Sequence, residues 1–535
     1  MPLRADSESV HERDHSAFRV HWSVVATPMS ARGVDPRSNL TVGPEIPDTT
    51  PARYQSALDA SARAARHLTW SDRTARGRWL TALADRLEAS QAQLVTLADQ
   101  ETALGQPRLE GELRRTTSQL RLFADVVRDG GYLQATWDPP DPSTTPPRPD
   151  LRSFGLPIGP VAIWPASNFP FAFGNLGTDT ASALAAGCPV LVKSHPAHPA
   201  TSSALGVIAL AALSDAGAPN GTFAVLHGED VGRILVSDSR VRAGAFTGSI
   251  RAGRLLFDLA CRRDAPIPFY AEMGSTNPVY VLPKAAGERP GEIAKGLVSS
   301  ITLGVGQFCT KPGIVFVPKA ATITAEVAHL VHECEPAPML TNGLRSGFQS
   351  VLEQIASRPG VEVLATGTTA TARNGAWVTP TLARMPMDLF LVDHRDVAVE
   401  CFGPFVLLVE YDEPDELLQA AELTEGGLTA TVHAEPDDVA NGLWPRLFGA
   451  IVERAGRIVW NGWPTGVAVG WATHHGGPYP ATTSTSTSVG AHAIARFVRT
   501  VCFQDFPDHL LPAELRATNP QSVPRRVGEI SQTER

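Results

Sequence analysis

The chain has 535 residues, of which 43% are hydrophobic and 7% aromatic, and its net charge at pH 7 is -9. This composition predicts a globular protein of two or three domains and excludes disorder over most of its length. An acidic chain has no basic surface field for nucleic acid or anionic membranes, so small molecules and proteins are the expected partners.

The cysteines and the start of the chain indicate a compartment. The six cysteines are scattered without a C-x-x-C spacing, which indicates neither a disulfide framework nor a thiolate metal site, so we expect no metal. The N-terminus has mixed charge and no apolar core segment, and no later stretch is long enough to span a bilayer. We therefore predict a cytoplasmic protein. Residues 1–43 are polar and aperiodic and are predicted to form a disordered extension.

Two helical regions follow this extension. Apolar residues recur at helical spacing over residues 51–103, and a further helix is predicted over residues 109–127. Both regions are interpreted as scaffold. Arginines on the second helix are typical of a solvated face, but Arg115 or Arg121 could instead reach a carboxylate on a substrate.

The pattern changes after a proline-rich segment at residues 138–150, which is a linker or an extended excursion. Strand-like runs then alternate with helices from residue 159 to Glu272, and one of these helices is predicted over residues 171–186. Such alternation predicts an α/β protein with a parallel, doubly wound sheet. Sheets of this kind bind ligands at the carboxyl ends of their strands.

A dinucleotide is the ligand expected at this sheet, although the G-x-G-x-x-G fingerprint is absent. The turn Thr247-Gly248-Ser249 lies between a predicted strand and a predicted helix, where backbone N–H groups and a hydroxyl can face an anion. Gly228 and Gly232 flank the start of the preceding helix and allow close backbone approach. Strand-to-helix turns also need such residues for structural reasons alone.

The stretch Gly306-Gln307-Phe308-Cys309-Thr310 lies between a predicted helix at residues 293–303 and a predicted strand at residues 314–317. A cysteine in a glycine-rich turn can be held rigidly with its sulfur facing an opening, which suits a nucleophile. The alternative is a buried structural cysteine. Candidate partners in loops bracketed by glycine or proline are Asn168, Glu272 and Glu400.

Six motifs occur in a consistent order and resemble the successive signatures of the aldehyde dehydrogenase superfamily. The resemblance covers roughly residues 51–506. Within the superfamily, other segments such as residues 193–199 and 475–482 are similar to an NADP-linked branch that includes 2,5-dioxovalerate (α-ketoglutaric semialdehyde) dehydrogenases. Lys311 departs from the usual pattern, as does the long extension before Gly43. The six motifs are Asn168-Phe169-Pro170, Val192-Lys193, Phe246-Thr247-Gly248-Ser249, Glu272-Met273-Gly274, Gly306-Gln307-Phe308-Cys309 and Glu400-Cys401-Phe402-Gly403-Pro404.

The resemblance implies a catalytic set. Cys309 would attack the aldehyde carbon as a thiolate, since an aldehyde has no good hydride to give until it carries an alkoxide. The side-chain amide of Asn168 and the backbone N–H of Cys309 would stabilise the oxyanion. Glu272 would act as the general base on the water that hydrolyses the thioester.

The resemblance also implies cofactor contacts. Glu400 would bind the nicotinamide ribose with Phe402 beside the ring, and Lys193 would contact the adenosine ribose. NAD-preferring relatives usually carry a glutamate three positions after this lysine, where the present chain has Pro196. Lys193 and Ser194 can donate to a 2′-phosphate with no carboxylate at that position, so NADP is favoured and NAD is the alternative.

The implied reaction is oxidation of 2,5-dioxovalerate to 2-oxoglutarate. The alternative substrate is a fatty or aromatic aldehyde, because Phe171 and other aromatic residues could line an apolar tunnel. A non-catalytic cofactor-binding protein is the alternative of another class, but it would have no reason to keep Asn168, Glu272 and Cys309. A coenzyme A-acylating enzyme would dispense with Glu272.

In this family a strand near the C-terminus pairs across a subunit interface, so a homodimer or homotetramer is implied.

The low-complexity tract at residues 482–488 is interpreted as a surface loop. The expected division begins with a cofactor-binding domain at residues 44–273, with residues 134–158 in an oligomerisation element, and a catalytic domain at residues 274–472. Residues 473–510 return to the cofactor domain and include an oligomerisation strand. Residues 511–535 form a tail, which is expected to be mobile after Ala517.

Overall fold

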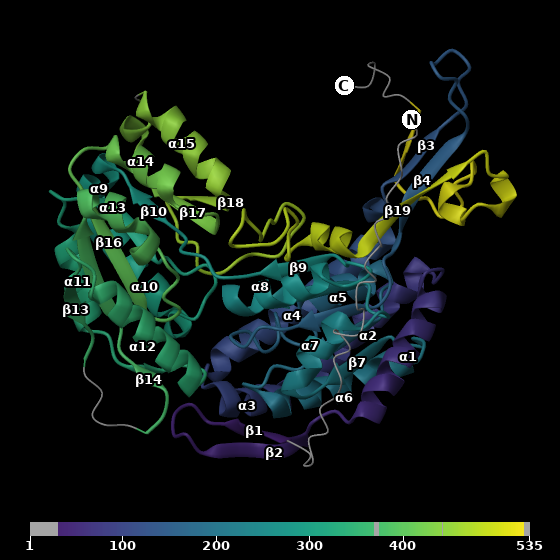
Figure 1. The fold of residues 1–535 in the computed structure, drawn as a ribbon, viewed down its shortest axis with the longest axis horizontal. Coiled ribbons are helices and arrows are strands. Elements are labelled where there is room, and N and C mark those ends of the chain that lie inside the picture. The colour runs from purple at the N-terminus through teal and green to yellow at the C-terminus, as the bar shows by residue number, and fades with distance from the viewer. Residues whose placement is uncertain (1–29, 369–373, 441, 529–535) are drawn as a thin grey trace, which may run out of the picture.

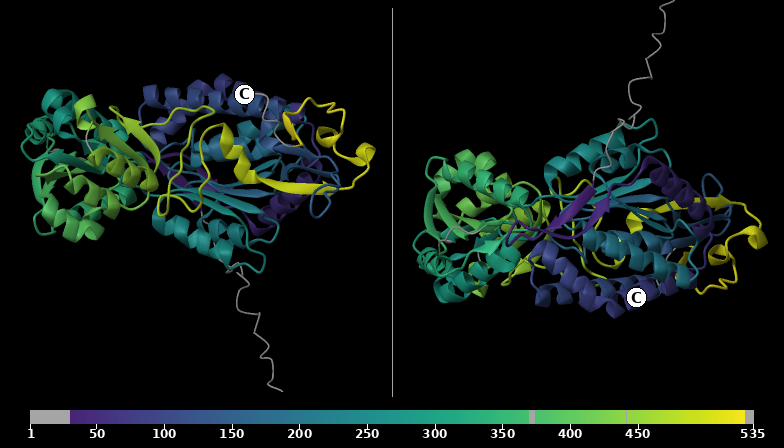
Figure 2. Two further views of the ribbon diagram at one scale, coloured as in Figure 1. Left: turned by 90° about the horizontal axis from the view of Figure 1, so that it is seen from above. Right: turned by 90° about the horizontal axis from the view of Figure 1, so that it is seen from below.

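The computed structural model describes residues 30–368, 374–440 and 442–528 and is organised around three sheets (Figure 1). A five-stranded sheet occupies the middle of the molecule. The seven-stranded and four-stranded sheets lie toward opposite ends of its long axis, as both views in Figure 2 show. The predicted α/β class is confirmed.

The predicted helical regions are present, but the first is divided. It contains α1 (Pro51–Leu68), α2 (Arg73–Ala89) and α3 (Gln91–Thr102), and the second is α4 (Gln106–Asp129). Asp72 caps α2 by accepting a hydrogen bond from the backbone N–H of Thr74. A left-handed residue, Ala103 at φ 55°, ends α3 and lets α4 turn back across it.

The five-stranded sheet is entirely parallel and is doubly wound, as predicted. Its order is β7-β6-β5-β8-β9, so the chain steps outward from β5 in one direction and then returns to its other side at β8. The crevice at this reversal is where such sheets bind ligands. The strands are β5 (Val161–Trp164), β6 (Val190–Lys193), β7 (Phe223–Leu226), β8 (Ala243–Thr247) and β9 (Phe269–Glu272), and the helices are α5 (Thr178–Ala186), α6 (Pro199–Asp215), α7 (Glu229–Ser237) and α8 (Ile250–Cys261).

The helix predicted over residues 171–186 begins only at Thr178, so its first turns are wrong. Residues 171–177 form tight turns instead. A Cβ at Gly174 would lie 1.8 Å from the carbonyl oxygen of Pro170, so only glycine fits there. The turns leave the segment before α5 irregular and close to the crevice.

The seven-stranded sheet carries the second half of the chain in the order β13-β15-β16-β11-β10-β17-β18. All its neighbouring strands are parallel except the pair β13 and β15. Its strands are β10 (Val279–Val281), β11 (Ile314–Pro318), β13 (Glu362–Thr366), β15 (Thr381–Pro386), β16 (Phe405–Tyr411), β17 (Gly427–His433) and β18 (Ala455–Trp460), with a separate pair β12 (Ala337–Pro338) and β14 (Trp377–Val378). The helices are α9 (Pro283–Glu288), α10 (Pro290–Thr302), α11 (Ile323–His332), α12 (Asn342–Ala356), α13 (Met387–Val397), α14 (Glu416–Leu423) and α15 (Leu443–Arg454).

The four-stranded sheet has the order β19-β4-β3-β20 and combines two distant parts of the chain. Its strands are β3 (Ala135–Asp138), β4 (Leu151–Pro157), β19 (Val498–Gln504) and β20 (Arg525–Val527). The prediction of a mobile tail after Ala517 is wrong for residues 518–528. Leu511, Leu515 and Val523 are buried against β3 and β4, and β20 pairs with β3. Residues 529–535 lie outside the described part of the chain.

The predicted N-terminal extension is also partly ordered. β1 (Ser30–Val34) and β2 (Thr41–Pro47) form an antiparallel pair against α3 and α6, at the lower edge of Figure 1. An ion pair of 2.7 Å between Arg37 and Asp99 fixes the turn, which corrects the prediction of disorder for residues 30–43. Residues 1–29 lie outside the described residues. Across the described ranges, none of the helices combines the length and apolar character that a bilayer span requires.

Candidate active site

A cavity of about 810 Å³ lies at the carboxyl ends of the five-stranded sheet and is closed on one side by loops of the second domain. Asn168, Glu272 and Cys309 all line it, so residues from three separate motifs meet there. Every predicted cofactor residue also lies on its wall, and the roles proposed for them remain predictions. These residues are Lys193, Ser194, Gly228, Gly232, Thr247, Gly248, Ser249, Glu400 and Phe402.

Cys309 is positioned by a left-handed turn. Gly304, Val305 and Gly306 have φ values of 56°, 59° and 66°, and a β-branched residue such as Val305 rarely adopts this conformation. A Cβ at Gly306 would lie 2.3 Å from the backbone of Gly403, so glycine allows the Cys309 loop to pack directly on the loop that carries Glu400. The turn therefore brings the nucleophile candidate to the edge of the cavity.

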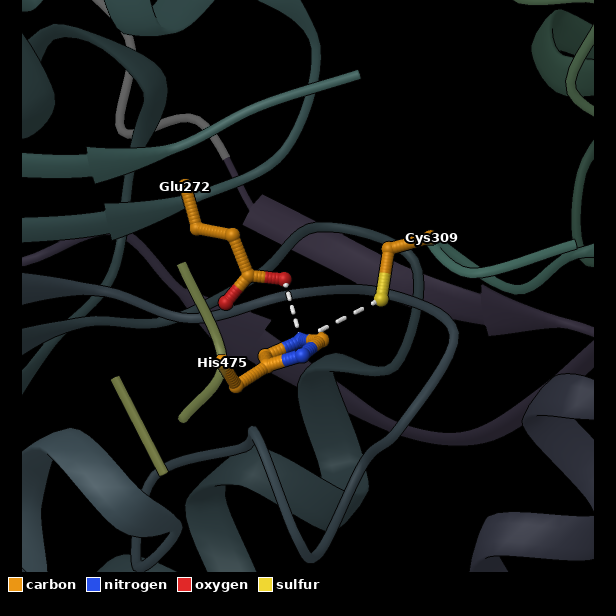
Figure 3. Close-up of side chains that lie close together, drawn as sticks. All are labelled: Glu272, Cys309 and His475. Atoms are coloured by element: carbon orange, nitrogen blue, oxygen red, sulfur yellow. Dashed lines mark hydrogen bonds and ion pairs between the residues drawn. The ribbon is translucent and has the colours of Figure 1, made fainter. Parts of the chain in front are cut away.

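The side chain of His475 connects Cys309 to Glu272, as Figure 3 shows. Its Nε2 atom lies 3.5 Å from Sγ of Cys309 and 2.9 Å from Oε1 of Glu272. Oε2 of Glu272 accepts a hydrogen bond of 2.6 Å from Ser488. A nucleophile, an imidazole and a carboxylate thus form one continuous set of contacts, which is the arrangement needed to move a proton from sulfur to oxygen.

The electrostatics of this set favour a neutral thiol beside an ionised carboxylate. Burial raises the pKa of the Cys309 thiol well above its usual range, and the charge of Glu272 adds to this increase. Burial also raises the pKa of Glu272, but the imidazole of His475 and the hydrogen bond from Ser488 outweigh it, so the carboxyl pKa is lowered overall. The thiol therefore needs a base at the moment it attacks.

His475 was not among the predicted site residues. It lies in the irregular segment between β18 and residue 491, where its backbone N–H donates to the hydroxyl of Thr487 and its carbonyl accepts from the N–H of Ser488. The interpretation of residues 482–488 as a surface loop is wrong in part, since Thr482, Thr487 and Ser488 are buried. A histidine beside this hydroxyl-rich tract was the available signal.

Asn168 faces the same region from the five-stranded sheet. Its Nδ2 atom donates a hydrogen bond of 2.8 Å to the carbonyl oxygen of Gln307. A side-chain amide carries two N–H groups, so one fixes the orientation and the other is left for an oxyanion beside Cys309. Arg108 supports this geometry by donating from Nη2 to the carbonyl oxygen of Asn168 at 2.7 Å.

Glu400 lies across the cavity from the five-stranded sheet. The backbone N–H of Ser275 donates to its Oε1 at 3.3 Å. Burial raises the pKa of Glu400 to about 7, although Ser275 and the nearby charge of Lys311 act in the opposite direction. Lys311, the residue that departs from the family pattern, is buried and donates from Nζ to the carbonyl oxygen of Phe405 at 2.7 Å.

The far end of the cavity from Cys309 is formed by Lys193, Ser194 and neighbouring residues. Oγ of Ser194 lies 2.8 Å from Nδ1 of His227. Burial lowers the pKa of Lys193, and the carboxylates of Glu229 and Asp48 act in the opposite direction. Both acids line the cavity. We expected no carboxylate to repel the 2′-phosphate of NADP at this position. That expectation is incomplete, because Asp48 and Glu229 supply carboxylates from other segments of the chain.

The residues at this end fit an adenosine group. A Cβ at Gly232 would lie only 3.2 Å from the indole nitrogen of Trp164. Because glycine has no side chain, this part of the cavity wall keeps room for a flat ligand. The indole N–H of Trp164 is buried and has no partner among the described residues. Ser249 caps α8 by accepting from the N–H of Ala252 at 3.3 Å, so its hydroxyl serves the helix as well as the cavity.

The three candidate substrate residues have different positions. Arg115 is half-buried, with its guanidinium 5.2 Å from the ring centre of Phe173 and within electrostatic reach of Cys309 and Glu272. Its Nε and Nη2 atoms are buried without a partner in the described residues. Arg121 does not reach the site, because it is bound at the surface to Glu88 and Asp85.

Phe171 does not reach the cavity either. Its side chain is 1% exposed and packs in the core between α4 and the five-stranded sheet. Its backbone N–H donates to Oε1 of Glu112, which fixes the turn in this position. The neighbouring aromatic residues Phe169 and Phe173 line the cavity instead. Alternate residues of this turn therefore face opposite sides.

Comparison with known proteins agrees with this geometry. A family model described as the aldehyde dehydrogenase family matches residues 27–500. Alpha-ketoglutaric semialdehyde dehydrogenase 2 of Azospirillum brasilense is 44% identical over 458 residues, which are 84% of this chain and 86% of that protein. Alpha-ketoglutaric semialdehyde dehydrogenase of Acinetobacter baylyi is 38% identical over 491 residues, 91% of each chain.

A solved structure shows the same fold at lower identity. The structure of PnpE in complex with nicotinamide adenine dinucleotide superimposes with a TM-score of 0.73 and 23% identity, over 91% of this chain and 96% of that chain. The structural likeness concerns the fold alone.

Proposed function

Because this chain belongs to the aldehyde dehydrogenase family and oxidises aldehydes with a nicotinamide cofactor, we propose that its substrate is 2,5-dioxovalerate and its product 2-oxoglutarate. The observation that carries this proposal is Arg115, whose guanidinium lies within electrostatic reach of Cys309 and Glu272 and has two nitrogen atoms without a hydrogen-bond partner among the described residues. The charge of Glu112 compensates part of the cost of burying this guanidinium, and a substrate carboxylate would supply the missing hydrogen bonds. The names of the two similar dehydrogenases support the same substrate.

The reaction begins at Cys309. As sulfur attacks, the thiol proton passes to Nε2 of His475, and the resulting imidazolium donates from Nε2 to the carboxylate of Glu272 at 2.9 Å. Sulfur then forms a thiohemiacetal with the aldehyde carbon. The free N–H of Asn168 and the backbone N–H of Cys309 donate to the new oxyanion, and one such donor typically lowers a barrier by about 3 kcal/mol.

The nicotinamide, when bound, supplies the hydride acceptor that converts the thiohemiacetal to a thioester. The cavity fits such a group, and Glu400, Phe402 and Lys193 are the residues that would hold it. Glu272 then takes a proton from water, which attacks the thioester and releases the acid. Its lowered pKa keeps it ionised for this step near neutral pH.

NADP is the cofactor that we propose, with NAD as the alternative. Lys193 and Ser194 supply donors for a 2′-phosphate, and Pro196 places no carboxylate beside them. Asp48 and Glu229 favour the hydroxyl groups of NAD.

We also propose a cytoplasmic homodimer or homotetramer. β19 is an edge strand with exposed residues, which supports pairing with another subunit.

The test is the absorbance of the reduced cofactor with 2,5-dioxovalerate and decanal, each with NADP and NAD, in the native protein and two arginine variants. Arg115→Met removes a charge-assisted contact worth about 1.5–3 kcal/mol, so kcat/KM for the dicarbonyl acid falls about tenfold to a hundredfold while that for decanal is unchanged. Arg121→Met is the matched control, since Arg121 lies at the surface. Equal losses on both substrates, or decanal as the better substrate, would overturn the substrate assignment.

A further inference from the structure

We propose that Cys309, His475 and Glu272 also form an inhibitory site for a divalent cation of the Zn²⁺ type. This inference concerns regulation of the active site and rests on the proposed function only for its physiological meaning. The three side chains offer one sulfur, one nitrogen and one oxygen ligand, and these atoms all lie within 4.8 Å of one another (Figure 3). No change of fold is needed to bring them together.

The distances suit a tetrahedral ion. Zinc bonds of about 2.3 Å to sulfur and about 2.0 Å to nitrogen or oxygen place the ligand atoms roughly 3.5 Å apart. Sγ of Cys309 is 3.5 Å from Nε2 of His475, and Nε2 is 2.9 Å from Oε1 of Glu272. The sulfur–nitrogen distance already fits, and the carboxylate must retreat by a few tenths of an ångström from the imidazole. The cavity beside Cys309 and Glu272 gives access and room for water as a fourth ligand.

The donor set selects the kind of ion. Thiolate and imidazole ligands favour Zn²⁺ and similar borderline cations, whereas Mg²⁺ and Ca²⁺ require oxygen ligands. A thiolate and a carboxylate together neutralise a doubly charged ion, which matters in a buried site. Arg115 and Arg457 are cations within electrostatic reach of Cys309, and their charges oppose binding.

Binding is a proton exchange without change of oxidation state. The S–H bond of Cys309 breaks, a sulfur–metal bond forms, and the thiol proton leaves to solvent. The imidazole binds through Nε2 and then carries its proton on Nδ1, which is buried and has no partner among the described residues. Metal-bound histidines usually donate this N–H to a hydrogen-bond partner, and loss of that partner typically lowers metal affinity about 10–100-fold. We therefore expect reversible rather than permanent binding. A bound ion occupies both the sulfur that attacks and the carboxylate oxygen that receives the proton, so activity stops.

The test measures metal binding directly. Co²⁺ is titrated into the full-length protein, where a near-ultraviolet thiolate band together with intense visible bands indicates a tetrahedral site with sulfur. One equivalent is expected in the native protein. Cys309→Ser should remove the thiolate band. His475→Asn should weaken Co²⁺ binding about tenfold or more, because even the loss of a residue that only hydrogen-bonds to a metal ligand has an effect of this size. His474→Asn is the matched control, because the adjacent histidine is not in the cluster.

A second measurement uses the unaltered protein. Buffered Zn²⁺ should slow alkylation of Cys309 by iodoacetamide, quantified by mass spectrometry of the peptide, and a chelator should restore the rate. Alkylation of the exposed Cys261 serves as an internal control. No protection of Cys309, or a Co²⁺ spectrum that is unchanged in Cys309→Ser, would overturn the inference. Neither readout requires turnover, so a protein that binds Co²⁺ but does not oxidise 2,5-dioxovalerate would refute the proposed substrate and leave the metal site standing.

Discussion

Arg108 donates a hydrogen bond of 2.7 Å from Nη2 to the backbone carbonyl of Asn168, and so links α4 to the residue that is placed to stabilise the oxyanion. Its guanidinium also lies 4.9 Å from the ring centres of both Phe169 and Phe308. These rings directly follow Asn168 and directly precede Cys309 in the chain. One half-buried arginine thus holds both donors of the oxyanion site in register.

Arg108→Met should therefore impair acylation more than sulfur reactivity. We expect hydrolysis of an activated ester such as p-nitrophenyl acetate to fall about tenfold to a hundredfold, because a shifted donor loses part of the roughly 3 kcal/mol that it supplies. Alkylation by iodoacetamide forms no oxyanion and should keep its rate. An equal loss in both assays would mean that the variant disturbs Cys309 itself. Arg114→Met, at an exposed position of the same helix, is the control.

His475→Asn should slow the attack of Cys309. The imidazole lies 3.5 Å from the sulfur and is the group placed to accept its proton, and such proton transfer typically contributes about 10²–10⁴-fold. The pH profile of iodoacetamide alkylation should move to higher pH, because the thiol pKa is already raised by burial and by Glu272. An unchanged profile would exclude His475 as the base. His474→Asn should leave the profile in place.

Glu400 should make cofactor binding depend on pH near neutrality. Its folded pKa is about 7, so the carboxylate that accepts hydrogen bonds from ribose hydroxyls forms as pH rises through that value. The Kd for the cofactor, measured by quenching of tryptophan fluorescence, should fall between about pH 6 and 8. Glu400→Gln should flatten this dependence.

The same raised pKa has a consequence for stability. A carboxyl group with a higher pKa in the folded state stabilises the fold fully below its unfolded pKa, and this contribution is lost as pH rises through about 7. Tm without cofactor should therefore decline over this interval in the native protein and less in Glu400→Gln. A parallel decline in both proteins would assign the effect to another group.

Asp48→Asn should shift the cofactor ratio toward NADP. The carboxylate of Asp48 lines the cavity within electrostatic reach of Lys193, and its removal reduces repulsion of a 2′-phosphate. Titration calorimetry should show a lower Kd for NADP and an equal or higher Kd for NAD. Asp230→Asn removes the same charge nearby but outside the cavity wall, so it separates a specific effect from net charge. Identical shifts in both variants would argue against a specific role for Asp48.

The parts of the fold that follow from periodicity were predictable. Strands and helices alternate in the first sheet because each strand is buried on both faces, as the fully buried β5 illustrates. Asn168, Glu272 and Cys309 could be found because each lies in a motif that resembles the aldehyde dehydrogenase superfamily, whereas the turn or element end that holds each of them left a structural role open. Their place on one cavity wall follows from the topology of the two sheets.

The residues that escaped prediction depend on contacts between distant segments. His475 lies in a long irregular segment and is oriented by Thr487 and Ser488, which no periodic pattern reveals. Asp48 comes from the end of β2 and meets Lys193 only because Thr49 and His227 bond through their backbones. Phe171 was predicted to line an apolar tunnel together with other aromatic residues, but the turn that Gly174 permits places its side chain in the core.

The pairing of β20 with β3 affects how this protein can associate. Each edge strand of a sheet is a template for further strands, and β19 with seven residues is one such edge. On the opposite side, the three-residue β20 covers β3 and, within the described chain, ends the sheet with a short and partly charged strand. Within the four-stranded sheet of the described residues, β19 is the extended edge, so this sheet can join another through β19 but cannot add copies indefinitely from both sides. The C-terminal segment thereby acts as a stop that favours closed assemblies over fibres.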